Sequence, residues 1–430
     1  MQIEEKSVTL HENLRQMKKF LIYTLTILTI AACHKEENEE DNYSERTVLV
    51  YMSGENNLSD GIQEDIDEMA EAKLHDKNHV LLVYVDDANK KRLPYLARIR
   101  NGVMTDSVSV KDMGISDSDP CSATADVMRS VINYAFRKYP SRNNDYGLVL
   151  WGHASGWVVE DSIATKTEQS AAVRSTKDGM HKAYGYDTGQ DSNNPAAWIN
   201  ISTMADVLSH VPHLRFIFAD CCHFQCLESL YELRNVADYI IGSPAEIPGE
   251  GAPYETVTPA LFERDSFYTA IVDRYYEEIY DKNCRVPLSV VKTSAMNEVA
   301  EATRQVLLSM KDTLSLSDYP DVSGLIHYYY APLFNDANDF ILRYAQPEAY
   351  TAWKEALSKA VVYKKMATKW ITNVEWSYTY SDFEMTEERY GGVSMFIPQN
   401  PYLRSKYQRY NYNIKKTAWY YAAGLESIGW

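Results

Sequence analysis

The sequence predicts an α/β fold in which helices cover both faces of a mostly parallel sheet. Short runs of apolar residues, mostly β-branched or aromatic, end abruptly in polar turns, as buried strands do. Stretches with apolar residues at helical spacing alternate with these runs between residues 46 and 243. Alternating strands and helices form right-handed crossovers, which lead to a parallel sheet with helices on each side. No repeat of fixed period is present, which argues against a solenoid or a propeller.

The first half of the chain contains the predicted sheet. We predict strands over residues 46–52, 79–85, 93–99, 146–153, 215–222 and 239–243. Helices are predicted where apolar side chains recur at helical spacing, over residues 62–70, 122–139, 201–211 and 227–235. Pro140 ends the second of these helices, because proline lacks the N–H group that a helix interior needs.

The second half of the chain is less regular. Residues 158–195 are polar and rich in Ser, Thr, Lys and Asp, which predicts a long loop. A strand is expected at 287–291, and the segment 293–370 has mainly helical spacing. Strand character returns at Gly392–Ile397 and ends at Pro398.

The first 33 residues have the pattern of an export signal. Lys18 and Lys19 are basic, the run Phe20–Ile30 is apolar, and Ala31 and Ala32 have the small side chains of a cleavage site. The run is shorter than the about 20 apolar residues that a membrane-spanning helix needs. With the following Cys33 this segment resembles a bacterial lipobox, which implies that Cys33 is lipidated and becomes the new N-terminus. An uncleaved apolar helix is the alternative.

The residues after Cys33 are densely acidic between His34 and Asp41. Such a stretch cannot bury apolar surface, so we expect a disordered tether. It also resembles the acidic tags that direct some lipoproteins of Gram-negative bacteria to the cell surface. The expected location is therefore the bacterial outer membrane, with the protein anchored by lipid and facing the periplasm or the cell surface.

These patterns divide the chain into four parts. Residues 1–33 form an upstream extension and a signal peptide whose expected start is Met17, and residues 34–45 form the tether. Residues 46–290 form the α/β domain. Residues 291–430 form a mainly helical C-terminal addition, whose strand near 392–397 is expected to rejoin the sheet.

The charge and the cysteine content narrow the possible functions. The 430 residues carry a formal net charge of −17 at pH 7, whereas nucleic-acid-binding domains have a basic surface, so we predict no nucleic-acid partner. Of the six cysteines, five follow Cys33, an odd number, so at least one thiol is unpaired within the chain. An unpaired thiol in an exported protein is a candidate reactive group.

Two of the predicted strands end in side chains that can act together. His153 follows one apolar run, and Cys222 follows another. The carboxyl ends of parallel strands meet at one edge of a sheet, where open α/β proteins bind their ligands. A thiol and an imidazole that face each other there are a nucleophile and its base. We therefore interpret the protein as a cysteine peptidase.

Four motifs resemble those of the clostripain-like cysteine peptidases, a family of the caspase-fold clan. They lie, in the order found in that family, at Val50–Asn57, Tyr146–Trp157, Asp220–Leu233 and Pro248–Tyr254. The resemblance extends over most of the chain after residue 46. It implies a caspase-like fold and the activity of a thiol protease.

By this resemblance Cys222 is the nucleophile and His153 its catalytic partner. The thiolate attacks the substrate carbonyl, the imidazole protonates the leaving amine, and the backbone N–H groups of Ala154 and Cys222 stabilise the oxyanion. The family usually has Gly after the His and Ala before the Cys, where this chain has Ala154 and Cys221. Strand alternation points Cys221 away from the face that carries Cys222, which favours Cys222 as the nucleophile.

The resemblance also implies a preference for basic residues. In the family, an Asp two positions before the nucleophile and an acidic residue in a later turn line the S1 pocket, which binds the side chain before the scissile bond; here they are Asp220 and Glu250. Carboxylates bind Arg through paired hydrogen bonds and Lys as a point charge. The expected substrates are therefore proteins or peptides with Arg or Lys. The alternative is that Asp220 caps a helix and Glu250 is a solvated turn residue.

The loop over residues 158–195 contains candidate sites of self-cleavage. Relatives in the family can be activated by cleavage after a basic residue in this region, and the basic residues here are Lys166, Arg174, Lys177 and Lys182. A plain exposed loop explains the same composition.

Other interpretations of the same residues exist. A catalytically inactive lipoprotein of the same fold, which binds peptides or a partner protein, is consistent with Ala154 and Cys221. The segment Cys221–Cys226 is rich in metal-ligating residue types, but a structural zinc site normally takes a second ligand pair, and none follows. Some relatives use calcium, but no Asp-rich calcium loop is present. We therefore predict no metal site and no cofactor, and leave the use of calcium open.

Overall fold

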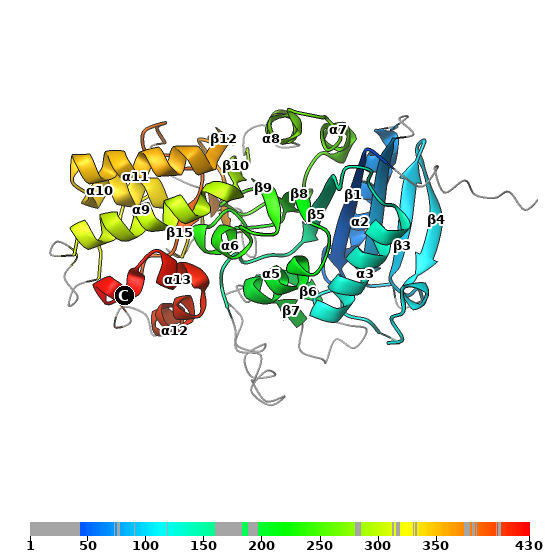
Figure 1. The fold of residues 1–430 in the computed structure, drawn as a ribbon, viewed down its shortest axis with the longest axis horizontal. Helices are drawn as coiled ribbons and strands as arrows, with labels where there is room; N and C mark the ends of the chain where they lie inside the picture. The colour runs from blue at the N-terminus through cyan, green and yellow to red at the C-terminus, as the bar shows by residue number, and fades with distance from the viewer. Residues whose placement is uncertain are drawn as a thin grey trace, which may run out of the picture. The chain divides into compact units, whose positions relative to one another are not determined.

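A nine-stranded sheet runs through the part of the chain that the structure describes, in the order β12-β10-β9-β8-β5-β1-β2-β3-β4 (Figure 1). The strands are β1 (Arg46–Gly54), β2 (His79–Asp87), β3 (Tyr95–Arg100), β4 (Val103–Ser109), β5 (Tyr146–Gly152), β8 (Leu214–Asp220), β9 (Ala237–Gly242), β10 (Leu288–Lys292) and β12 (Val361–Lys365). The central strands β9-β8-β5-β1-β2 are parallel. The outer strands pair antiparallel. The predicted mostly parallel sheet is confirmed.

The structure is a computed structural model. It describes residues 44–72, 74, 78–89, 91–117, 119–159, 183–187, 197–279, 285–311, 314, 319–329, 331, 333–373, 379–380, 383, 385–400, 402 and 406–430. Cys33, with the rest of the predicted signal peptide, lies outside these residues. Among the helices of the described ranges, none combines the length and the apolar character that crossing a membrane requires.

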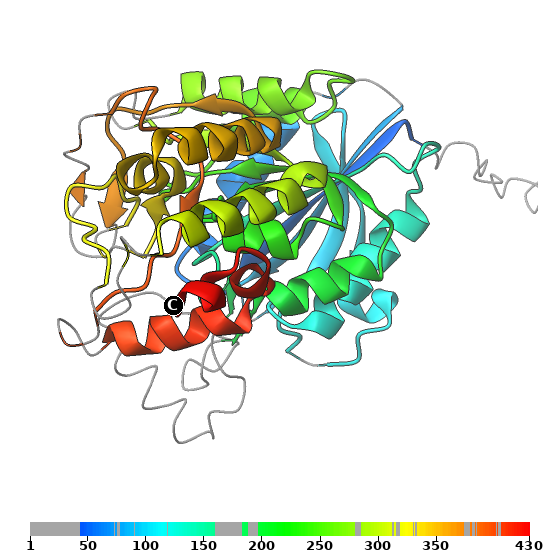
Figure 2. The same cartoon turned by 60° about the vertical axis from the view of Figure 1, so that its left-hand side comes forward.

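Helices cover both faces of the sheet (Figures 1 and 2). The helices on one face are α2 (Ile62–Glu71), α7 (Tyr254–Ala260) and α8 (Phe267–Glu278), and those on the other include α3 (Ala125–Lys138), α5 (Ile201–Ser209) and α6 (Leu227–Glu232). Successive side chains of a strand point to opposite faces. In β1, Val48 therefore packs in the core under α2, and Leu49 packs in the core under α3. A strand buried on both sides is apolar throughout, which explains the uninterrupted apolar runs.

The C-terminal part is mainly helical, as predicted. Its helices are α9 (Met296–Ser309), α10 (Ala337–Tyr344), α11 (Pro347–Ala360), α12 (Lys406–Asn413) and α13 (Ala418–Ala422). They gather at the end of the sheet formed by β10 and β12 (Figure 1). Buried side chains such as Trp353 and Trp419 belong to the same core as Leu49, so this region packs on the α/β part within one compact unit, Ser44–Trp430.

The predicted return of a strand at 392–397 to the central sheet is wrong. Only Ser394–Met395 form a strand, β15, and it pairs with β11 (Asn335–Asp336) in a separate two-stranded sheet. The reason is that other groups take its backbone donors. The N–H of Ser394 donates to the carbonyl of Gln225 (2.9 Å), and the N–H of Phe396 donates to the carboxylate of Glu228 (2.7 Å).

The C-terminal contribution to the central sheet comes instead from β12. This strand lies inside the segment 293–370, which was predicted as mainly helical. Its first residues, Val361, Val362 and Tyr363, are β-branched or aromatic, the types that favour strands. The predicted loop over 158–195 also contains a strand, β6 (Tyr184–Asp187), which pairs with β7 (Ala197–Ile199).

Replacing Leu150 by Ala is expected to lower the free energy of unfolding by about 2–5 kcal/mol, because this fully buried side chain of β5 leaves a cavity. The matched control is Leu308→Ala in α9, whose 40% exposed side chain should contribute less than about 0.5 kcal/mol. Chemical denaturation followed by circular dichroism measures both values. Equal unfolding midpoints for the two variants would contradict the central position of β5.

Candidate active site

His153 and Cys222 lie just beyond the carboxyl ends of two neighbouring parallel strands. Trp151 of β5 stands opposite Asp220 of β8, and each predicted catalytic residue lies two positions further along its chain. Cys222 packs against the same core as Trp151, under α2, α7 and α8. The structure therefore brings the predicted nucleophile and its partner to the same edge of the sheet.

This edge is also where the strand order reverses. The chain passes from β1 to β2 on one side of β1 and later returns to β5 on its other side. Such a reversal opens a crevice outside the strand ends, which is where α/β proteins bind ligands. The turn after β1 reaches across it, and Asn57 Oδ1 lies 2.8 Å from His153 Nε2. Because an amide oxygen only accepts, Nε2 carries the proton, and Nδ1 of the neutral ring is left as the proton acceptor.

Asn57 is a residue whose role the sequence analysis missed. It stands in the first motif, Val50–Asn57, but the motif by itself does not say which side chain its amide contacts. Asn57 contacts His153 because β1 and β5 are neighbours in the sheet, and the sequence alone does not show that pairing. The available signal was the position of Asn57 in the turn that follows a parallel strand, because such turns border the ligand crevice.

The surroundings of His153 favour the neutral ring. Its carbonyl accepts a hydrogen bond from the N–H of Gly185 (2.9 Å), and its ring meets the edge of Tyr186 with centroids 5.9 Å apart. Both contacts come from β6. Burial lowers the pKa of His153 to about 4. The imidazole is therefore neutral at physiological pH.

The thiol of Cys222 is also neutral. The N–H of Ile247 donates to Sγ at 3.3 Å, which favours the thiolate. Burial and then the charge of Glu246 outweigh this bond and raise the pKa of Cys222 to about 12. In the structure the two groups are thus a thiol and an imidazole, not a preformed ion pair.

Cys221 and Cys222 point to opposite faces of the sheet, as predicted. Cys221 is buried in the core under α3 and α5, whereas Cys222 packs against the core on the other face. Burial raises the pKa of the Cys221 thiol well above its ordinary value. Cys121, Cys221, Cys222 and Cys226, the cysteines of the described residues, are all free.

His223 shapes the turn after Cys222 and packs in the protein interior. Its φ of 56° lies in the left-handed region, so the chain turns sharply directly after Cys222. Its Nδ1 hydrogen-bonds to the carbonyl of Pro244 (3.1 Å), and its ring stacks on Phe334 with centroids 4.5 Å apart. With Cys221 and Cys222 on opposite faces and Nδ1 bonded to the backbone, the described segment Cys221–Cys226 is not arranged as a zinc site.

Ala154 fits the backbone without strain. Ala takes a positive φ less readily than the Gly that the family usually has at this position, but Ala154 is not among the residues with positive φ. The positive φ falls one position before His153 instead, at Gly152 (140°). A Cβ atom there would lie 2.8 Å from the carbonyl oxygen of Ser53, so Gly152 is the residue that this turn requires.

Asp220 is buried and held by neutral donors. Its carboxylate accepts hydrogen bonds from the N–H of Ala252 (3.1 Å) and from the hydroxyls of Tyr254 (2.9 Å) and Tyr275 (3.1 Å). Burial raises the pKa of Asp220 to about 6, although these bonds favour the charged form. Asp220 therefore titrates close to the physiological range.

A second acidic residue, Asp65 of α2, lies close to Asp220. It accepts a hydrogen bond from the indole N–H of Trp151 (2.5 Å). Burial, followed by the charge of Asp220, raises the pKa of Asp65 to about 8. Asp65 lies within the helix predicted over residues 62–70, but a helical pattern does not indicate which strand residue its side chain contacts.

Glu250 lies on an exposed turn, closed by the N–H of Gly251 donating to the carbonyl of Pro248 (3.0 Å). The turn packs against Asp220, because a Cβ atom on Gly251 would lie 3.1 Å from its carboxylate. The structure thus brings the turn of Glu250 next to Asp220. The remaining predicted site residues, Cys33, Lys166, Arg174, Lys177 and Lys182, lie outside the described residues.

Comparisons with known proteins agree with this geometry. The sequence model of the clostripain family matches residues 50–428. A secreted C11 cysteine protease from Bacteroides thetaiotaomicron, solved with an irreversible peptide inhibitor, is 30% identical, with a TM-score of 0.71 over 89% of this chain and 100% of that chain. An inactive zymogen C11 protease from Parabacteroides distasonis is 27% identical, with a TM-score of 0.68 over 89% of this chain and 98% of that chain.

A third structure, the Bacteroides thetaiotaomicron C11 protease called iotapain, is 20% identical, with a TM-score of 0.66 over 89% of this chain and 99% of that chain, and it supports the fold. A search of curated proteins gave no match. The family match covers far more than half of the chain, and the sheet and helices match those of C11 proteases. This chain belongs to the clostripain family and is a cysteine peptidase with a caspase-like fold.

Proposed function

We propose that this protein hydrolyses peptide bonds after Arg or Lys, with Cys222 as the nucleophile and His153 as the general base. The position of both residues beyond the ends of β5 and β8 supports the pair. The hydrogen bond from His153 Nε2 to Asn57 supports Nδ1 as the base, since it fixes the tautomer of the ring.

The reaction follows from the neutral state of both groups. Nδ1 of His153 takes the proton of the Cys222 thiol as Sγ attacks the carbonyl carbon of the substrate. The tetrahedral oxyanion accepts hydrogen bonds from the backbone N–H groups of Ala154 and Cys222. The C–N bond then breaks, and His153 passes its proton to the leaving amine. A water molecule, deprotonated by His153, hydrolyses the thioester and releases the acid.

The preference for basic residues rests on one observation, the uncompensated carboxylate of Asp220. Its donors among the described residues are neutral, and no described basic side chain contributes to its pKa. A substrate guanidinium or ammonium group supplies the missing positive charge. Glu250 adds an acidic group near it on the exposed turn, and Asp65 of α2 adds a buried carboxyl that can accept or donate a hydrogen bond there.

We also propose that the protein is made as a precursor and activated by its own cleavage after Lys166, Arg174, Lys177 or Lys182. The composition of the segment supports this, and a similar protein from Parabacteroides distasonis is described as an inactive zymogen. For the location, we propose export and lipid anchoring through Cys33. The signal pattern supports this, and a similar Bacteroides thetaiotaomicron protein is described as secreted.

Replacing Cys222 by Ala should lower kcat/KM by at least about a thousandfold, because the nucleophile is lost. The matched control, Cys221→Ala, should retain most of the activity, because that thiol faces the opposite core. The measurement uses peptides with Arg or Lys before a fluorogenic leaving group. Full activity of the Cys222 variant would contradict the assignment. Equal turnover of acidic and basic peptides would contradict only the role of Asp220. No turnover by reduced, fully processed wild type would favour the inactive, peptide-binding alternative.

The pH dependence should differ between substrates. With Arg or Lys before the scissile bond, kcat/KM should fall below pH about 6, because the protonated form of Asp220 predominates below its raised pKa and carries no charge. With a neutral residue there, kcat/KM should persist until His153 is protonated, at pH about 4. Profiles of both substrates for wild type and Asp220→Asn test this, since the variant should lose the difference. Identical acid limbs in wild type would rule out Asp220 as the specificity residue.

Self-cleavage should depend on the nucleophile. N-terminal sequencing of the purified wild type should give a second sequence that starts after one of the four basic residues. The Cys222→Ala protein should remain uncut, because it cannot form the acyl-enzyme. Equal cleavage of both proteins would show that another protease makes the cut.

A further inference from the structure

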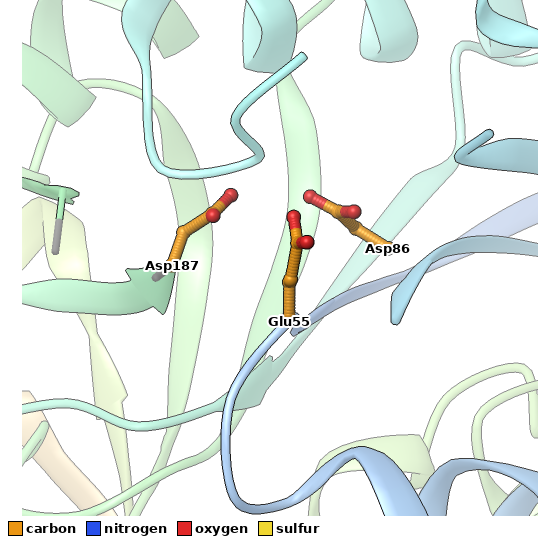
Figure 3. Close-up of side chains that lie close together, drawn as sticks. All are labelled: Glu55, Asp86 and Asp187. Carbon is orange, nitrogen blue, oxygen red and sulfur yellow. The ribbon is translucent and has the colours of Figure 1, made fainter. Parts of the chain in front are cut away.

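Three buried carboxylates meet at the carboxyl edge of the sheet, close to the turn that contacts His153. They belong to Glu55 in the turn after β1, Asp86 near the end of β2, and Asp187 at the end of β6. Their side chains are 4%, 1% and 2% exposed, and one oxygen of each lies within 4.8 Å of the others. Figure 3 shows the three carboxylates pointing toward one another.

Ser122 holds two of these carboxylates in place without cancelling their charge. Its N–H donates to Asp187 Oδ2 (2.7 Å) and lies 3.1 Å from Asp86 Oδ2, and its hydroxyl also donates to Asp187 Oδ2 (3.0 Å). These donors are neutral. Buried carboxylates at such short distances repel one another, so the cluster holds either a proton shared between Asp86 and Asp187 or a cation between the carboxylates.

The hydroxyl of Tyr84 gives a second, independent indication of a ligand. Tyr84 precedes Asp86 by two residues on β2, so both side chains lie on the same face of the sheet. The side chain is 0% exposed, and no described residue hydrogen-bonds to its hydroxyl. That hydroxyl nevertheless lies in the electrostatic field of Asp86, Asp187 and Glu55. A buried hydroxyl normally has a partner, and a water molecule on a bound cation would be one.

We propose that Glu55, Asp86 and Asp187 bind a hard divalent cation. Carboxylate oxygens are the ligands that Ca²⁺ and Mg²⁺ prefer, with water completing the shell. Three carboxylate oxygens within 4.8 Å of one another can contact one cation, and both Ca²⁺ and Mg²⁺ fit this bound. No Asp-rich loop marks the site in the sequence, because its ligands come from three separate segments.

The cation site connects the elements that hold His153. Glu55 precedes Asn57, which bonds to the imidazole, by two residues, and Tyr186, which meets the ring edge, directly precedes Asp187. The side chain of Asn56 already joins the two segments by donating to the carbonyl of Tyr186 (2.5 Å). A cation bound by Glu55 and Asp187 ties the turn after β1 to β6 and so positions the imidazole.

The binding test uses the full chain with Cys222→Ala, so that self-cleavage does not interfere. After removal of metals with EDTA, titration with CaCl₂ and separately with MgCl₂ should show one cation per chain. The melting temperature should rise by a few degrees at about a hundredfold excess over Kd. Adding Asp86→Asn or Asp187→Asn should abolish this rise. The matched control is Asp238→Asn, an exposed carboxylate paired with Arg215, which should keep it.

The binding and melting measurements test the proposal without relying on peptidase activity. In EDTA the two Asn variants should be at least as stable as their parent, because each removes a repelling charge; this separates loss of the site from misfolding. Protein that binds neither cation at millimolar concentration overturns the proposal, whatever the variants do. Binding that survives in both Asn variants overturns it as well. In active protein, EDTA should lower kcat more than it raises KM, because the cation positions His153 and does not touch the substrate.

Discussion

The parallel pairing of β5 with β1 on one side and β8 on the other is the constraint on which the site depends. Its register places Gly152 opposite Ser53 and Trp151 opposite Asp220. A shift by one residue would exchange the two faces of β5 and move His153 to the other core. The close contact between Gly152 and the carbonyl of Ser53 allows no side chain at that point, so the register and the turn before His153 support each other.

Burial determines which ionisable side chains at this edge of the sheet are charged. The reactive pair is uncharged because burial penalises both the thiolate and the imidazolium. Acidic groups are concentrated on both faces of the same edge: Asp65 and Asp220 on the side of α2, and Asp86 with its neighbours on the side of α3. Several of the acidic residues in the formal net charge of −17 are therefore buried, and burial raises the pKa values of Asp65, Asp86 and Asp220.

The sequence was most informative where one side-chain pattern determines one structure. The apolar runs predicted β1, β2, β3, β5, β8, β9 and β10 of the central sheet, and strand alternation assigned Cys221 and Cys222 to opposite faces. The sequence was least informative where a residue contacts a segment far away along the chain. The position of β12 and β15, and the contact of Asn57 with His153, depend on which strands become neighbours. Four strand residues with mixed polarity, Tyr184–Asp187, also gave too weak a pattern to mark β6.

The turn after Cys222 obtains some of its last hydrogen bonds from residues far along the chain. The carbonyl of Gln225 accepts from Ser394, and the carboxylate of Glu228 accepts from Phe396, 168 residues later. During synthesis these donors are made long after Cys222, so the acceptors wait for them. In a chain that ends before Ser394, the carbonyl of Gln225 and the carboxylate of Glu228 lack these two donors. The C-terminal part thus contributes directly to the backbone hydrogen bonding of the segment that follows the thiol.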